Sequence, residues 1–274
     1  MRNRFVFRKP NDSQELLSLL RLRYESFHRS RLKGFVKNCT GGLDVDPWDG
    51  YATHYGLYHE TEGKEKPVGY LRIVGLDISP QSSLLHSLAC QFVEVATAIA
   101  NPREALLPLL TYDDPNHVIA DIFAKIRSNS LSVVEPGRIS LSHEYQALPL
   151  SRYLVESAIA LYFAGIYKVD RAILSCAVQH SDFYQKFGFA LIPGSVNRCR
   201  KVDWILAALV GSPQRVPSHI MQRVEVLARE YELTGHTTKY FGSSIEVRSA
   251  STPTAQTVAS VQHSNLVNCG SAWA

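Results

Sequence analysis

The chain has 274 residues, of which 45% are hydrophobic and 20% charged, enough for one large core or for a core domain with a small appendage. Its formal net charge of +4 is too small to indicate a nucleic-acid-binding protein without a concentrated basic patch. The five cysteines are scattered and have no spacing typical of a metal site, so we expect no metal and a reducing compartment.

The N-terminal segment has only a short apolar run, residues 5–7, and lacks the apolar core of a signal peptide. The longest apolar run, at residues 158–167, is too short to span a bilayer. We therefore expect a cytoplasmic protein without integral membrane association.

The first elements predict a strand, a helix and a hairpin. Residues 4–7 predict a short strand, and Asp12 with Glu15 has the spacing of a capping box that opens a helix. An acidic segment, residues 42–55, follows a Gly-Gly break. The stretches "HYGLYHE" and "PVGYLRIVG" then predict two strands, because the polar "TEGKEK" between them contains a glycine, as a hairpin connection should.

Residues 77–130 have helical periodicity and predict a helical insert between strands. The following strand, "LSVVEPGRISLS", is interrupted by Pro136-Gly137, which predicts a bulge or an edge distortion there. After it we expect a buried helix ("LSRYLVESAIALYFAGIY"), a strand ("RAILSCAV"), a short helix ("HSDFYQKFG"), a strand ("FALIPG") and an amphipathic helix at residues 217–233.

Strands that alternate with helices predict an α/β fold with a mixed central sheet flanked by helices. We expect a core domain at residues 1–200 that contains the insert, a helical extension at residues 201–242 and a low-complexity tail at residues 243–274. The tail is almost uncharged and rich in Ser, Thr, Gln, Asn and Val, which predicts weak structure.

The acidic segment "GLDVDPWDGYATHY" places Asp44, Asp46 and Asp49 within six positions. Taken alone, such a segment is typical of a solvated loop. An unpaired buried charge costs several kcal/mol, so three acids can share a buried site only if cations neutralise them. Arginines elsewhere in the chain can make the planar two-pronged contacts required. The motif order described below selects Arg23, Arg72 and Arg138 for this role.

The segment "HSDFYQKFGFALIPG", from His180 to Gly194, resembles the end of the GNAT acyltransferase fold. There a strand runs into a short "FY-x-x-x-GF" helix and a final strand beside a thioester donor. The resemblance implies that Tyr184 protonates the departing thiolate. The alternative is that Tyr184 and its neighbouring phenylalanines only pack the core.

The pair Glu135 and Arg138 in "VVEPGRISLS" would by itself indicate a structural ion pair. The order of motifs, however, resembles that of the acyl-homoserine-lactone (autoinducer) synthases, a branch of the GNAT fold. Their pattern is an arginine and a phenylalanine on the first helix, a Gly-Trp pair, an acidic loop, a strand arginine and an E-x-S-R motif. The matching residues here are Arg23, Phe27, Gly34, Phe35, Asp44, Asp46, Asp49, Arg72, Glu135 and Arg138.

Two positions depart from this pattern, since Phe35 replaces the tryptophan and Gly137 replaces the serine. The run "DGYATHY" is more similar to long-chain N-acyl amino acid synthases and exosortase-associated acyltransferases, which take a fatty acyl group from acyl-carrier protein. The resemblance covers roughly residues 4–195. It implies an N-acyltransferase that moves a fatty acyl group from acyl-carrier protein to the amine of an amino acid or an amino-acid derivative, with S-adenosylmethionine as an open alternative acceptor.

Amide formation from a thioester needs a base for the amine, a donor for the developing oxyanion and a proton for the thiolate. We expect Glu135 to be the base, through a water molecule, with Asp46 as the second choice. A backbone N–H near the bulge, at Ile139 or Ser140, is expected to donate to the thioester carbonyl. The acid cluster is expected to shape the acceptor pocket, with a left-over acid for the substrate ammonium and with His54 as a further contact.

The donor is expected to arrive on a carrier protein. Acetyl-CoA enzymes of this fold usually hold the pyrophosphate on a Gly-rich turn at a helix N-terminus, but the corresponding "HEYQALPLSRYL" has no glycine. Arg152, or the basic run that contains Arg198, Arg200 and Lys201, could meet the phosphodiester and the acidic carrier surface; a solvated basic face is the alternative for that run. The apolar insert at residues 83–126 is either an acyl-chain pocket or ordinary packing.

Two other readings of the chain stay open. It could be an acyl-CoA-dependent GNAT N-acetyltransferase, or a non-catalytic module that binds acyl thioesters. In each case we expect no tightly bound cofactor, with acyl-carrier protein or acyl-CoA as a donor substrate. Cys176, on the predicted penultimate strand, is expected to belong to the core rather than to act as a nucleophile.

Overall fold

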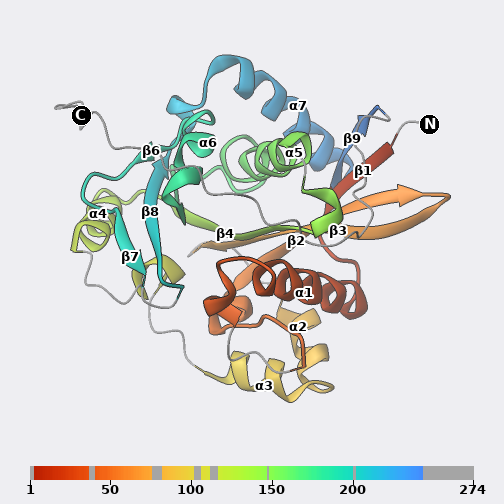
Figure 1. Cartoon of the computed structure of the whole chain (residues 1–274). Helices are drawn as coiled ribbons and strands as arrows, with labels where there is room; N and C mark the ends of the chain where they lie inside the picture. Colours follow the sequence, from red (N-terminus) through yellow and green to blue (C-terminus); the bar gives the residue numbers. More distant parts are fainter. Residues whose placement is uncertain are drawn as a thin grey trace, which may run out of the picture.

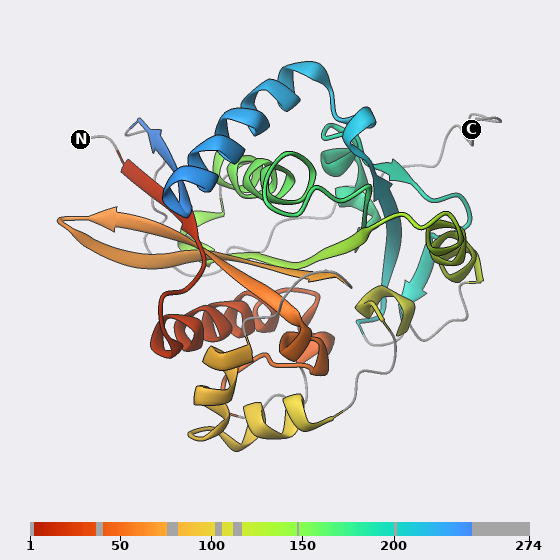
Figure 2. The ribbon, with the colours of Figure 1, turned by 180° about the vertical axis from the view of Figure 1, so that it is seen from behind.

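The computed structural model describes residues 3–36, 41–75, 82–101, 106–111, 117–146, 148–199 and 202–242. A mixed sheet with the strand order β6-β8-β5-β4-β3-β2-β1-β9 forms its centre, and β7 pairs with β8. Helices α5 and α7 cover one face of this sheet, and α1, α2 and α3 lie on the other (Figures 1 and 2). The predicted mixed central sheet flanked by helices is therefore confirmed.

The strands are β1 (Asn3–Arg8), β2 (Ala52–Thr61), β3 (Lys64–Gly75), β4 (Val133–Leu141), β5 (Arg171–Ala177), β6 (Ala190–Leu191), β7 (Asn197–Cys199), β8 (Trp204–Gly211) and β9 (His236–Phe241). The α-helices are α1 (Ser13–His28), α2 (Ser82–Ala89), α3 (Val93–Ala100), α4 (His117–Ser128), α5 (Leu148–Ile159), α6 (Ser181–Gln185) and α7 (Ser218–Thr234). Single helical turns that matter for the site are η1 (Lys33–Val36), η2 (Pro47–Tyr51) and η3 (Pro108–Thr111).

Helix α1 begins as its sequence predicts. The carboxylate of Asp12 accepts a hydrogen bond from the backbone N–H of Glu15 at 2.8 Å. The carboxylate of Glu15 binds the guanidinium of Arg8 at 2.7 Å and the backbone N–H of Asn11 at 2.8 Å. The Asp12 half of the predicted capping box is therefore present, and Glu15 ties the start of the helix to β1.

Strands β2 and β3 form the predicted hairpin. Glu62 and Gly63, at its tip, have φ angles of 53° and 73°. Positive φ at both central residues gives the turn a twist that matches the right-handed twist of the strands.

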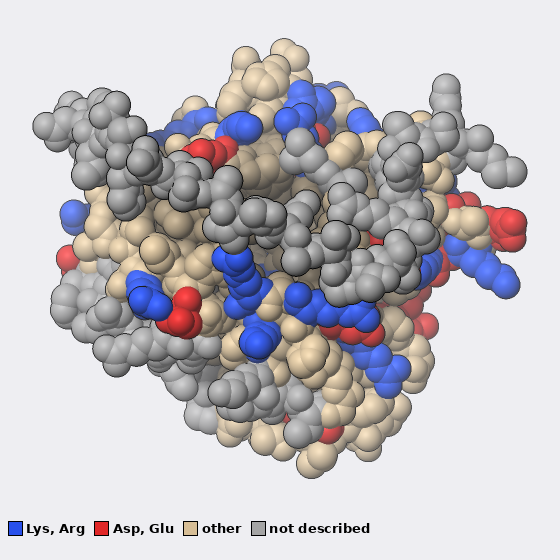
Figure 3. All heavy atoms as spheres, in the orientation of Figure 1, with Lys and Arg blue, Asp and Glu red and all other residues tan. Residues whose placement is uncertain are grey.

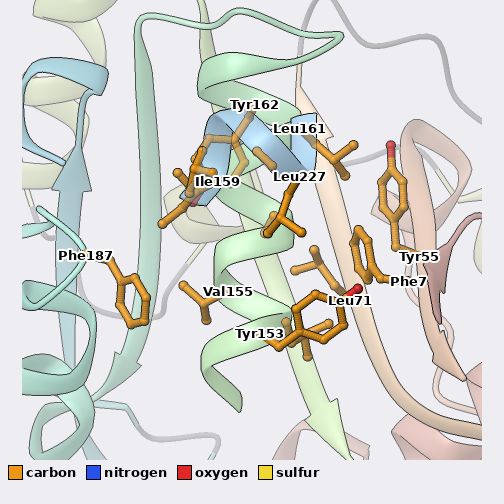
Figure 4. Packing of buried hydrophobic residues seen from close by; sticks show 14 of the residues in the cluster. Phe7, Tyr55, Leu71, Tyr153, Val155, Ile159, Leu161, Tyr162, Phe187 and Leu227 are labelled. Carbon is orange, nitrogen blue, oxygen red and sulfur yellow. The ribbon is translucent and has the colours of Figure 1, made fainter. Parts of the chain in front are cut away.

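The sheet has a core on each face. On the α5 and α7 side, Ile159 and Leu227 belong to one buried cluster with Phe7 and Leu71 of the strands (Figure 4). On the other side, the apolar face of α1 packs with α2 and α3, and two further leucines of α1 pack with tyrosines of β2 and β3. These two cores hold α1 and the sheet in a fixed relation, which positions the charged residues described below.

The sheet splits between β4 and β5. These strands pair in parallel only at Val133 with Arg171 and Val134 with Ala172. Beyond this point β5 stays paired with β8 as far as Ala177, while β4 stays paired with β3. The two strands therefore diverge and leave a wedge-shaped opening that begins at Glu135.

A bulge in β4 lies beside this opening, but not where the sequence predicts it. Pro136 and Gly137 remain in register with Ile73 and Arg72 of β3. The register shifts afterwards, and Arg138 has a positive φ of 55°. The bulge therefore lies one or two residues after the position expected for it. The alternative of an edge position holds at Pro136, because β5 has diverged there and an edge strand tolerates proline.

The expected helical extension at residues 201–242 is also wrong. This stretch contains β8, which pairs with β5 and β6, and β9, which extends the sheet beside β1. The apolar run of β8 is buried for most of its length as a strand within the sheet, and the helices of the described part of this stretch are α7 and a single turn at Pro213–Arg215. The predicted tail at residues 243–274 lies outside the described residues.

Candidate active site

The acidic segment is folded back onto α1, β3 and β4, and its own backbone fixes its shape. Asp46 caps η2 by accepting a hydrogen bond from the backbone N–H of Trp48 at 3.0 Å. Asp49 returns the contact, because its carboxylate accepts from the backbone N–H of Asp46 at 2.8 Å. The first turn of η2 therefore holds two carboxylates in a defined geometry.

Arg23 of α1 is fully buried and contacts two of the acids. Its guanidinium donates to both carboxylate oxygens of Asp49, each at 2.8 Å, in a two-pronged contact. Its Nε lies 2.8 Å from a carboxylate oxygen of Asp44, and Nη2 also donates to the backbone carbonyl of Asp44. This one side chain of α1 therefore holds the acidic segment at Asp44 and at Asp49.

Arg72 of β3 and Arg138 of β4 complete the neutralisation. Nη1 of Arg72 donates to Asp46 at 2.6 Å and to Asp49 at 2.9 Å. Nη2 of Arg138 donates to Asp46 at 3.0 Å, and its Nη1 lies 3.4 Å from Asp44. The three acids and three arginines predicted from the sequence thus form one network with a formal charge of zero.

The charge balance of this network changes the expectation that one of its acids is left over for the substrate. Although burial raises the pKa of Asp46, the charges of Arg72 and Arg138 hold it below its ordinary value. Burial likewise raises the pKa of Asp49, but Arg23 and Arg72 hold it well below the ordinary value. Each of the three acids forms an ion pair with at least one arginine. The cluster therefore leaves no acid without a cationic partner, unlike the left-over acid that we expected for a substrate ammonium.

The guanidinium of Arg138 also lies between two aromatic rings. Its central carbon is 5.3 Å from the ring centre of Phe27 and 5.3 Å from that of Phe35. Cation–π contacts of this kind stabilise a partly buried cation. Phe35, one of the two positions that depart from the motif pattern of the sequence analysis, supplies one of these aromatic contacts.

His54 lies beneath the cluster and is fully buried. Its Nε2 is 3.2 Å from the backbone carbonyl of Asp49, which can only accept, so Nε2 carries the proton. Its Nδ1 therefore accepts from the hydroxyl of Tyr70 at 2.8 Å, and this hydroxyl accepts from Arg23 at 2.9 Å. Burial lowers the pKa of His54 to about 4, so the ring is neutral and braces Asp49 rather than touching an acceptor.

A pocket of about 250 Å³ fills the opening between β4 and β5. Eight of the residues singled out in the sequence line it: Phe27, Phe35, Asp46, Arg72, Glu135, Arg138, Ile139 and Tyr184. Arg23, Asp44, Asp49 and His54 lie behind its wall, since each is nearly or fully buried. The pocket and the charge network therefore share Asp46, Arg72 and Arg138.

Glu135 is the other acid in the pocket wall. One of its carboxylate oxygens, Oε2, accepts a hydrogen bond from the backbone N–H of Leu109 in η3 at 2.9 Å. Burial raises the pKa of Glu135 to about 8, although the Leu109 N–H and the charge of Arg72 partly oppose this. A carboxyl group whose pKa lies near neutrality can both take up and release a proton under working conditions.

Tyr184 and Cys176 face the pocket from the opposite side of the opening. Burial raises the pKa of the Tyr184 hydroxyl, which keeps its proton and is available to donate it. Burial also raises the pKa of Cys176 to about 12, so its thiol stays protonated and is a poor nucleophile. Phe187 and Phe189 pack in the core, as the alternative for this segment predicts.

Only some of the residues expected to bind the donor line the pocket. Ile139 lines the pocket, whereas Ser140 is buried and its hydroxyl donates to the backbone carbonyl of Arg138 at 3.0 Å. Arg152 is exposed on α5 and is not part of the pocket lining. Arg198 is exposed and pairs with Asp203 at 2.6 Å, and Arg200 and Lys201 lie outside the described residues.

Sequence reasoning missed several residues of the site. Trp48, Pro108 and His180 line the pocket, and Leu109 holds Glu135 through a backbone group. Trp48 and His180 lie within segments that the sequence did single out. Nothing in the sequence marks Leu109, because any residue with a backbone N–H could make its contact.

The raised pKa of Glu135 predicts how stability depends on pH. Between its ordinary pKa, about 4.3, and about 8, the folded protein holds a proton here that the unfolded chain has lost. The free energy of unfolding of the wild type should therefore fall with rising pH across this window, relative to Glu135→Gln. Urea unfolding of both proteins at pH 5, 6, 7 and 8 measures this difference; a gap that does not change with pH would refute the burial of an ionisable Glu135.

Among the described residues, no group of three or more His, Cys, Asp or Glu side chains has an arrangement that could hold a metal ion. In the same part of the chain, no helix has both the length and the apolar character needed to cross a membrane.

No protein-family model matches the chain, and no curated protein matches it. Among solved structures, FeeM, an N-acyl amino acid synthase from uncultured soil microbes, matches with a TM-score of 0.47 and 16% identity over 77% of this chain and 92% of that one. BjaI, a CoA-dependent acyl-homoserine lactone synthase, matches with a TM-score of 0.44 and 14% identity over 78% of this chain and 90% of that one. LasI, an acyl-homoserine-lactone synthase, matches with a TM-score of 0.42 and 12% identity over 76% of this chain and 88% of that one.

These proteins belong to the groups that the motif order resembles. At such identities and TM-scores, the matches carry no functional assignment over to this chain.

Proposed function

We propose that the protein is an N-acyltransferase that moves a fatty acyl group from the thioester of acyl-carrier protein to the amine of an amino acid or an amino-acid derivative. One observation carries this proposal. Of the two acids that line the pocket in the described part of the chain, Asp46 is held by two arginines, while Glu135 is held only by a backbone N–H. The site therefore supplies one carboxylate suited to proton transfer.

In the proposed reaction, the nitrogen of the neutral acceptor amine attacks the carbonyl carbon of the thioester and forms the new C–N bond. As this bond forms, the carboxylate of Glu135 takes a proton from the nitrogen, directly or through one water molecule. The C–S bond breaks, and the departing thiolate takes the proton of the Tyr184 hydroxyl. The products are an amide and the free thiol of the carrier, and transfer of the proton from Glu135 to Tyr184 through solvent restores the enzyme.

The opening in the sheet suits a thioester on a pantetheine arm. Because β4 and β5 stop pairing after Val134 and Ala172, each strand turns an edge toward the opening. An extended ligand that contains amide groups can add to such an edge through main-chain hydrogen bonds. The bulge after Gly137 interrupts pairing with β3, and we assign the N–H of Ile139 as donor to the developing oxyanion.

Basic residues near the pocket favour a carrier protein as the source of the donor. Arg29, Arg31 and Lys33 follow α1 and are exposed, while Leu32 between them lines the pocket. In Figure 3, Lys and Arg side chains lie over the region where Figure 1 shows the end of α1 on the side of β8. Acyl-carrier protein presents an acidic surface, which would complement these charges. Arg198 remains a further candidate.

The direct test is an in vitro reaction followed by mass spectrometry. Purified full-length protein is incubated with dodecanoyl-acyl-carrier protein and each of the twenty amino acids, and with S-adenosylmethionine. We expect an N-dodecanoyl product, with far less product when dodecanoyl-CoA replaces the carrier at equal concentration. Product only with short acyl-CoA would favour an N-acetyltransferase, and thioester binding without turnover of any amine would favour a non-catalytic module.

Tyr184→Phe tests the role of the hydroxyl. It removes one oxygen from a side chain for which no hydrogen bond is seen within the described residues, so stability should change little. If the hydroxyl protonates the thiolate, kcat should fall by roughly 10²-fold, as for loss of a general acid. Steady-state kinetics with the carrier thioester measure the effect, and a kcat equal to that of the wild type would remove Tyr184 from the mechanism.

A further inference from the structure

Gly137 leaves an empty position in a row of side chains across the sheet. His54 of β2 pairs with Arg72 of β3, and Arg72 pairs with Gly137 of β4. Residues directly opposite one another in neighbouring strands carry their side chains on the same face. Glu135, two positions before Gly137 on β4, also shares this face. The row therefore ends at the opening with a residue that has no side chain.

The backbone does not require glycine at this position. The φ angle of Gly137 lies outside the left-handed region that favours glycine. Among the described residues, a Cβ built on Gly137 would meet a single atom within 4 Å, Oε1 of Glu135 at 3.9 Å, which is an ordinary van der Waals distance. Neither conformation nor packing therefore explains the glycine, and the space above it is open.

The two oxygens of Glu135 are placed differently. Oε2 accepts the hydrogen bond from Leu109, which fixes the orientation of the carboxylate. Oε1 is the oxygen that borders the open space at Gly137. Arg72 and Asp46 line the pocket on the same side, but they are tied to each other at 2.6 Å. The oxygen left for a ligand is thus the one beside the open space.

We infer that the space over Gly137 is the subsite for the acceptor amine, so that Gly137 is a specificity-determining residue and Leu109 a positioning residue for Glu135. This inference rests on the proposed function. An amine nitrogen in this space would lie beside Oε1 of Glu135, and the thioester carbonyl would lie one bulge further along β4, at Ile139. A side chain at position 137 would occupy the space that the amine and its first carbon need.

The experiment compares full-length Gly137→Ala and Gly137→Ser with the wild type and with Gly242→Ala. Gly242 follows β9, at the edge of the sheet, and its Cβ would meet no atom of the described residues within 4 Å. KM is measured separately for dodecanoyl-acyl-carrier protein and for the amino acid that the wild type acylates fastest. Thermal unfolding is measured for all four proteins.

We expect both Gly137 variants to unfold within a few degrees of the wild type and to keep the KM for the carrier thioester. Their KM for the amine should rise roughly 10-fold or more, because an added methyl or hydroxymethyl group competes for the same space. Gly242→Ala should match the wild type in every respect.

An unchanged amine KM in an active Gly137 variant would overturn the inference and leave the proposed function standing. A loss of folding in both Gly137 variants would overturn it as well, since the space would then not be open. If the wild type itself forms no amide with any acceptor, the proposed function fails and the inference fails with it.

Discussion

Arg23→Ala is expected to lower the free energy of unfolding by about 3–5 kcal/mol, the usual cost of removing one partner from a buried ion pair. The change leaves Asp49 without its two-pronged partner and Asp44 without its contact to Nε. Both carboxylates are almost fully buried, so water cannot replace the guanidinium without opening the fold. In a chain of this size the melting temperature should fall by roughly 10 °C.

Urea unfolding measures this loss, and the chain offers a matched control. Arg198 pairs with Asp203 at 2.6 Å, but the two side chains are 71% and 77% exposed. Arg198→Ala removes the same atoms from an ion pair of similar length, and a pair in water contributes about 0–1 kcal/mol. If the free energy of unfolding falls equally in the two variants, Arg23 is not buried among the acids.

A double-mutant cycle between Arg23 and Asp49 isolates their interaction. Arg23→Ala together with Asp49→Ala should cost clearly less than the sum of the single changes, because the double variant leaves fewer unpaired charges. Additive losses would contradict the direct contact between these two side chains.

Glu135→Gln is expected to reduce kcat by about 10²–10⁴-fold, the range for removal of a general acid or base. The substitution keeps the shape of the side chain, and the amide oxygen of glutamine can still accept from the backbone N–H of Leu109. Its folding should therefore be preserved, and the loss of activity would report the missing proton acceptor. Glu144→Gln is the control, because the side chain of Glu144 is 39% exposed and pairs with Lys66, and Glu144 is not part of the pocket lining.

The pH profile makes this prediction more specific. The base must be deprotonated, and burial raises the pKa of Glu135 to about 8. The kcat/KM of the wild type should rise with pH up to about 8 and then level, since this parameter reports groups of the free enzyme. The residual activity of Glu135→Gln should lack this step. A wild-type profile that levels near pH 5 would show that Glu135 is an ordinary exposed carboxylate or takes no part.

The charge network could be predicted from the sequence because its physical requirement is simple. Asp44, Asp46 and Asp49 are too close together to be buried unless cations meet them. The motif order, rather than the apolar face predicted for α1, selected Arg23, Arg72 and Arg138 as these cations. The requirement that each buried acid meets a cation therefore connects residues up to 92 positions apart, such as Arg138 and Asp46.

Other parts of the site depend on register, which the sequence does not show. The position of the bulge follows from how β4 pairs with β3, more than 60 residues earlier in the chain. The role of His54 follows from its pairing with Arg72, which places it under the cluster rather than in the pocket. The contact between Leu109 and Glu135 uses only a backbone N–H, so no residue type marks it.

The error at residues 201–242 has a similar cause. The apolar run "WILAALVG" of β8 has no alternating pattern, because this strand is buried within the sheet. Only α7 has a clear helical period in that stretch, and it suggested a helical appendage. The three-dimensional partners of β8, in β5 and β6, decide its place instead.

The most direct test is a crystal structure of the protein with the preferred amine and a stable ketone analogue of dodecanoyl-pantetheine, in which a CH2 group replaces the thioester sulfur and the carbonyl is kept. The analogue should extend between β4 and β5, with its carbonyl at Ile139 and the amine within one hydrogen bond or one bridging water of Glu135. An analogue bound on the outer surface of the sheet, or an amine held by the aspartates with Glu135 turned away, would contradict the assignment of this opening as the place of acyl transfer.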